Sequence, residues 1–134
     1  MGWLLDSASA RQLGAEPTGH ASRGTGGAPG VSVTNVYMRA GTASPRDLMH
    51  GIARGIYVTE LIGMGVNPVT GDYSRGASGF LIENGAVSHA VTEITIAGNL
   101  KDMFAALIPA NDLQFRYAIN TPTLRIDGMT VAGG

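Results

Sequence analysis

The spacing of apolar positions predicts two or three helices among strands. The clearest helix covers residues 100–108, where apolar residues recur at intervals of three and four, as they do on one face of a helix. Asn99 can cap its N-terminus, and Pro109 can end it. The apolar stripe consists of Leu100, Met103, Phe104, Leu107 and Ile108. We expect this stripe to pack on the domain's own sheet.

Two further helices are predicted nearer the N-terminus. Residues 3–13 carry several apolar residues roughly on one side, and Gly14 is a suitable stop. The second helix has a clear start, because Ser44 can act as N-cap and Pro45 fits the first helical position. Gly55 is expected to end it.

Runs of β-branched and aromatic residues predict strands. The Asn-Gly pair at 84–85 lies between two apolar runs and favours a two-residue turn with positive φ at both positions. In that hairpin Ile82 would lie opposite Val87, and Phe80 opposite His89. The predicted strands cover residues 31–38, 56–61, 79–83, 86–97, 113–118 and 123–131.

Two segments are rich in glycine and polar residues. Residues 15–30 have no periodic pattern and are expected to form a long flexible loop. Residues 63–76 form a second predicted loop, directly before a strand. A chain of 134 residues fits one domain, so a single domain over residues 1–134 is expected.

Composition limits the possible functions. The net charge of -1, without a basic stripe, makes a nucleic-acid partner a poor expectation. No apolar run approaches the roughly 20 residues that a membrane-spanning helix needs. Cysteine is absent, which excludes disulfides and thiolate zinc sites and fits a reducing cytoplasm.

The content of charged residues is low. It is 14%, against about 25% in a typical domain. We therefore expect a compact β-rich domain with many turns, much of whose surface is covered by something else. The opening residues have the character of mid-protein sequence, so the chain is expected to be a fragment of a longer protein.

The sequence offers no evident catalytic or metal-binding motif. His20, His50 and His89 are far apart, and none has an acidic residue beside it. A zinc hydrolase would want two histidines one helical turn apart with a glutamate between them. We therefore predict neither a catalytic residue nor a metal ligand in this chain.

The most suggestive segment is 67–76, which combines turn-forming residues with an aromatic and two opposite charges. One interpretation is an ordered turn, in which Asp72 and Ser74 satisfy local backbone donors. The other is a loop that lines a cleft or a subunit contact. The residues alone leave both open.

Several blocks of sequence resemble the C-terminal domain of the TldD/PmbA family of zinc metallopeptidases. The most specific are Thr-Gly-Asp at 70–72 and Ile-Glu-Asn-Gly at 82–85. The resembling blocks occur in the family's order over nearly the whole chain, at residues 18–23, 34–35, 55–59, 70–79, 82–85, 96–100 and 129–133.

The resemblance is to the PmbA side of the family, also called TldE. TldD carries a His-Glu-x-x-x-His zinc helix and a cysteine in its C-terminal domain, and this chain has neither. The resemblance implies an α+β fold that is largely antiparallel sheet. It also implies a cytoplasmic complex with a TldD-like subunit or the protein's own N-terminal domain, with zinc in the partner and none here.

The resemblance therefore implies a non-catalytic or regulatory subunit domain of a zinc peptidase complex. That complex degrades unfolded peptides and processes peptide antibiotic precursors. The alternative is a non-enzymatic binding module of the DNA gyrase modulator type. The resemblance makes Thr70, Gly71, Asp72 and Ser74 the candidates for lining the peptide chamber or an interface.

Overall fold

The structure is a computed structural model that describes residues 3–133. These residues form three helices and ten strands, and nearly all strand pairs are antiparallel. The predicted α+β class is thereby confirmed. The chain divides into two compact units, residues 3–37 with 115–120, and residues 38–114 with 121–133. The prediction of a single domain over 1–134 stays a prediction.

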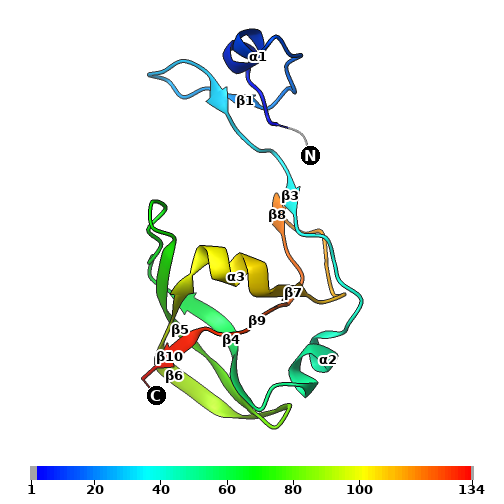
Figure 1. Cartoon of the computed structure of the whole chain (residues 1–134), viewed down its shortest axis with the longest axis vertical. Coiled ribbons are helices and arrows are strands. Elements are labelled where there is room, and N and C mark those ends of the chain that lie inside the picture. Colours follow the sequence, from blue (N-terminus) through cyan, green and yellow to red (C-terminus); the bar gives the residue numbers. More distant parts are fainter. Residues whose placement is uncertain (1–2, 134) are drawn as a thin grey trace. The chain divides into compact units, whose positions relative to one another are not determined.

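The larger unit is built on a four-stranded antiparallel sheet in the order β10-β6-β5-β4 (Figure 1). Its long members are β4 (Arg54–Ile62), β5 (Asp72–Glu83) and β6 (Ala86–Asn99). The short strand β10 (Thr130–Ala132) pairs with the end of β6. The predicted loop over 63–76 is therefore too long, because β5 already begins at residue 72.

The β5–β6 hairpin has the predicted register only near its turn. Ile82 pairs with Val87, as predicted. Phe80 pairs with Ala90 and not with His89, so that prediction is wrong. The cause is an irregularity in the ladder, where three steps along β6 match two along β5.

The core of the larger unit is small. Ala77, Ile94 and Ile96 are its buried centre, and no large side chain among residues 3–133 is fully buried. Partly buried apolar side chains pack around this centre: Ile56, Val58, Tyr73, Val91 and Met129. A sheet of this length with so few buried residues leaves much apolar surface uncovered.

Helix α2 (Pro45–His50) begins as its sequence predicts. The Ser44 hydroxyl accepts from the backbone N–H of Asp47, and the Asp47 carboxylate accepts from the Ser44 backbone N–H. The hydrogen bonds from Ser44 lower the pKa of Asp47. The predicted end at Gly55 is wrong. The helix ends at His50, and β4 begins at Arg54, where it pairs with β5.

Helix α3 (Leu100–Ala106) is shorter than predicted. The next residues form β7 (Leu107–Pro109), which pairs with β9 (Leu124–Ile126). A proline ring disfavours helical geometry in the residue before it. The helix therefore ends before Pro109, although the periodic apolar pattern continues to Ile108. Asp112 accepts hydrogen bonds from the hydroxyl and backbone N–H of Thr123, which lower the pKa of Asp112 and join the ends of β7 and β9.

The expectation that the α3 stripe forms core is wrong at Phe104 and at Ile108, which is 42% exposed. The Phe104 side chain is 67% exposed, whereas Leu100, Met103 and Leu107 are half-buried. Apolar residues spaced three and four apart identified the apolar side of the helix. This spacing carries no information on how far the sheet extends beneath that side.

The smaller unit contains α1 (Ser7–Leu13), capped by the Asp6 carboxylate and ended by Gly14 in left-handed conformation. The helix is shorter than the predicted 3–13. The chain then forms the pair β1 (Ala21–Ser22) and β2 (Gly30–Val31). Flexibility of loop 15–30 stays a prediction.

Two more strands of the smaller unit, β3 (Val36–Tyr37) and β8 (Ile119–Asn120), pair in parallel. Of the predicted strand over 31–38, only residue 31, in β2, and residues 36–37, in β3, belong to strands. Residues 113–118 form no strand, so that prediction is wrong. The predicted strand over 123–131 divides into β9 and β10, which belong to different sheets.

We predict that Gly85→Val destabilises the protein. Asn84 and Gly85 both have positive φ, at 50° and 79°, and a Cβ at Gly85 would lie 2.6 Å from the His50 carbonyl oxygen. The left-handed conformation alone should lower the free energy of unfolding by about 1–2 kcal/mol. Chemical denaturation measures this, with Gly24→Val as control, because Gly24 has open space and no positive φ. Equal losses for both variants would refute the turn's role.

Candidate functional site

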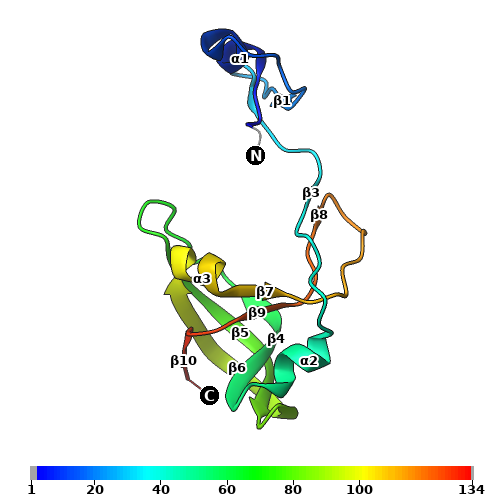
Figure 2. The same cartoon turned by 45° about the vertical axis from the view of Figure 1, so that its right-hand side comes forward.

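The four predicted site residues lie where the β4–β5 loop meets α3. Thr70 and Gly71 end the loop, and Asp72 and Ser74 belong to the first residues of β5. In both views the loop rises beside the helix (Figures 1 and 2). The structure brings three of the four, Thr70, Gly71 and Asp72, against the N-terminus of α3.

Asn99 connects the loop to the helix. Its side-chain N–H group donates to the Thr70 carbonyl at 3.1 Å and to the Asp72 carboxylate at 3.4 Å. Its side-chain oxygen accepts from the Lys101 backbone N–H at 3.1 Å and thereby caps α3. The Leu100 backbone N–H donates to the Gly71 carbonyl at 2.7 Å. We call these residues, 70–72 with 99–100, the loop–helix junction.

The Thr-Gly-Asp sequence fits this junction residue by residue. The Thr70 hydroxyl donates to the Asp72 carboxylate at 2.7 Å. Gly71 is buried and has a φ of 83°, and a Cβ there would lie 3.0 Å from the Asn99 side-chain oxygen. A larger residue at position 71 would therefore suffer both strain and crowding.

The remainder of the loop is held by backbone contacts. The side-chain oxygen of Asn67 accepts from the backbone N–H groups of Val69 and Thr70. The Ser74 backbone N–H donates to the Gly65 carbonyl at 2.7 Å. The loop is an ordered turn, in which the side chain of Asn67, rather than those of Asp72 or Ser74, accepts from local backbone donors. The Asn-Pro pair at 67–68 was the available signal for this role.

The ordered loop presents apolar side chains outward. Met64 is 95% exposed and Val69 is 91% exposed. Phe104, one helical turn from the capped start of α3, is exposed as well. Residues 63–71 contain no charged side chain. Exposed apolar side chains on a fixed backbone are typical of protein contact surfaces.

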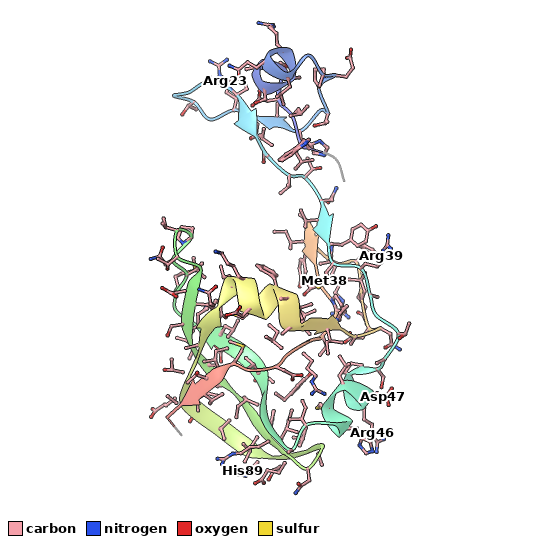
Figure 3. The ribbon with its side chains drawn as sticks, in the orientation of Figure 1. Arg23, Met38, Arg39, Arg46, Asp47 and His89 are labelled. Atoms are coloured by element: carbon pink, nitrogen blue, oxygen red, sulfur yellow. The ribbon has the colours of Figure 1, made fainter. Side chains whose placement is uncertain are left out.

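The described residues do not form a metal site. His20 lies in the smaller unit beside Thr18, whereas His50 ends α2. His89 projects from β6, labelled in Figure 3, and contacts the neighbouring Ser88. Within residues 3–133 no three His, Cys, Asp or Glu side chains gather closely enough to hold a metal ion. The same residues include no helix long and apolar enough to cross a membrane.

The fold and sequence together place the chain in a known family. Residues 1–133 match the PmbA/TldA metallopeptidase C-terminal domain. The metalloprotease PmbA of Escherichia coli O157:H7 is 43% identical over 132 residues, which are 98% of this chain and 27% of that protein. A PmbA homolog of Haemophilus influenzae is 42% identical over 98% of this chain and 28% of its own length. The chain belongs to the PmbA/TldD metallopeptidase family.

Solved structures agree with this assignment. A candidate modulator of a DNA gyrase from Thermotoga maritima superposes with a TM-score of 0.82 at 32% identity, over 97% of this chain and 30% of that one. TldE from Thermococcus kodakarensis gives a TM-score of 0.81 at 27% identity, over 98% of this chain and 31% of that one. The chain thus spans less than a third of the length of these relatives.

We predict that the two roles of Asn99 can be separated by mutation. Asn99→Ala removes both the cap and the contacts to the loop, and should lower the free energy of unfolding by about 1–2 kcal/mol or more. Asn99→Asp keeps an acceptor for the Lys101 N–H but loses the donor and places a second carboxylate beside Asp72. It should be less stable than the wild type at pH 7, because it brings two carboxylates side by side.

The measurement is urea denaturation at pH 7. Asn35→Ala is the control, because Asn35 is an exposed asparagine in the smaller unit, outside the junction. Wild-type stability of Asn99→Asp at pH 7 would contradict the proposed contact with Asp72.

Proposed function

We propose that this chain is a non-catalytic domain of a TldD/PmbA-type zinc peptidase complex. The observation that carries the proposal is the family membership of a chain whose described residues gather no metal-ligand set. Metalloprotease relatives need a metal ion, so its ligands would come from elsewhere in the assembly. Zinc in a TldD-like subunit is the proposed source.

The proposed substrates are unfolded peptides, including the precursors of peptide antibiotics, and the proposed location is the cytoplasm. The absence of cysteine is consistent with a reducing compartment. In the assembly this domain would contribute to the wall of the chamber that encloses the peptide, and Thr70, Gly71, Asp72 and Ser74 would help to shape that wall.

The loop–helix region is the proposed contact with the TldD-like subunit. Met64 and Val69 lie almost wholly in solvent. Their chain neighbours Gly65 and Thr70 are held by hydrogen bonds from Ser74 and Asn99. A preorganised loop loses little conformational entropy on binding, so its apolar side chains can contribute their full burial to affinity. Phe104 on the adjoining helix would extend the same contact.

A non-enzymatic module is the competing proposal. The Thermotoga maritima relative is described as a candidate modulator of a DNA gyrase, and the exposed apolar loop would serve such binding equally well. The two proposals differ in their consequence. Only the first requires that peptide cleavage appear when a TldD-like subunit is added.

We predict that the full-length protein cleaves no unstructured peptide alone and does so after mixing with a TldD-like subunit. The purified protein should carry far less than one zinc per chain, whereas the complex should retain zinc. Met64→Asp should weaken assembly at least tenfold, because a buried carboxylate at an apolar contact is unfavourable. Val87→Asp is the control, since Val87 is 47% exposed and lies at the far end of the hairpin.

Cleavage by the purified protein alone, or one zinc per chain in it, would overturn the proposal. Stable gyrase binding together with no cleavage in the mixture would favour the competing module. If Met64→Asp and the wild type assemble equally well, the loop is not part of the contact.

A further inference from the structure

Arg75 occupies an unusual place on β5. Side chains alternate along a strand, so Arg75 lies on the same face as Tyr73 and Ala77, which belong to the core. Its neighbour on β6 is the buried Ile96, and Ala77 pairs with the buried Ile94. Arg75 is therefore a cation on the apolar face of the sheet, and it is itself half-buried.

The guanidinium of Arg75 is poorly satisfied. Its Nε is buried and has no hydrogen-bond partner among the described residues. One terminal nitrogen lies 3.4 Å from the Leu61 carbonyl oxygen, at the long limit for such a bond. No carboxylate among residues 3–133 forms an ion pair with Arg75.

Two acidic residues lie near Arg75 along the paired strands. Asp72, at an even position of β5, is on the opposite face of the strand from Arg75 and accepts from Thr70 and Asn99. Glu60 lies opposite Ser78, whose hydroxyl donates to its carboxylate. Neither carboxylate forms an ion pair with Arg75.

An open groove is lined by three neighbours of Arg75, namely Leu61, Tyr73 and Ile96, although not by Arg75 itself. Leu61 and Tyr73 line it together with apolar residues of β4, α3 and β9, and its volume is about 550 Å³. Glu60 is the one charged side chain among the groove's described lining residues. A carboxylate brought to Arg75 would therefore meet an unpaired cation beside a mostly apolar surface.

We propose that Arg75 is the binding site for a carboxylate group of another polypeptide. A guanidinium presents paired N–H donors that match a carboxylate, and a half-buried pair of this kind is stronger than one in water. The carboxylate can come from a peptide C-terminus or from an Asp or Glu side chain of a docked segment. The proposal goes beyond the peptidase role, because it holds whether or not the assembly cleaves peptides.

The test uses the full-length protein and three short acetylated peptides of alanine and leucine. One has a free C-terminal carboxylate, one is amidated, and one is amidated with an internal glutamate. Calorimetry measures their affinities for the wild type, Arg75→Gln, Arg75→Lys and Arg54→Gln. Arg54 is the control, because it is an exposed arginine at the far end of the adjacent strand β4.

We expect at least one carboxylate peptide to bind the wild type tenfold or more tightly than the uncharged peptide. Arg75→Gln should abolish that difference, Arg75→Lys should keep part of it, and Arg54→Gln should keep all of it. Dependence on the free C-terminus identifies a peptide end as the ligand. Dependence on the glutamate identifies an acidic side chain.

A purely structural role for Arg75 gives a different result. Removing an unpaired charge from an apolar face should leave the unfolding midpoint of Arg75→Gln unchanged or raise it. A lowered midpoint or failure to fold would overturn the proposal, since Arg75 would then stabilise the sheet. So would equal affinities of the charged and uncharged peptides for the wild type.

Discussion

The register between β5 and β6 is the constraint on which the rest of the larger unit depends. It sets Ala77 against Ile94, which makes the centre of the core. At the far end it places Asp72 opposite Asn99, and this pair becomes the loop–helix junction. A shift by one residue would turn every side chain to the other face and separate the loop from the helix it contacts.

The small core and the exposed loop have a common explanation in a larger assembly. A sheet with three long strands and few buried side chains gains little stability from its own packing. Three of the exposed apolar residues, Met64, Val69 and Phe104, lie on the β4–β5 loop and on α3. Family relatives are more than three times as long as this chain. Under the proposed function, the additional polypeptide would cover this surface, and the metal chemistry would belong to the partner.

The sequence predicted those features whose causes are local. The turn at 84–85, the capping of α2 by Ser44 and the capping of α3 by Asn99 each follow from neighbouring residue types. The partner of Phe80 could not be predicted, because a ladder irregularity depends on both strands. The contact of Asn99 with Thr70 spans 29 residues and exists only once the hairpin has formed. The resemblance pointed to the segment around Thr70 and Asp72, but only the structure shows how it is held.

Native-state hydrogen exchange tests the central claim, that the hairpin register fixes the β4–β5 loop as an ordered surface. The informative amides are those of Leu100, Asn67 and Ser74, which donate to Gly71, Asp72 and Gly65. The account predicts slow exchange at all three, with protection close to that of the β5–β6 ladder and well above that of Gly26 in the glycine-rich loop. Exchange of the three amides at the rate of an unstructured peptide, while the ladder stays protected, would contradict it.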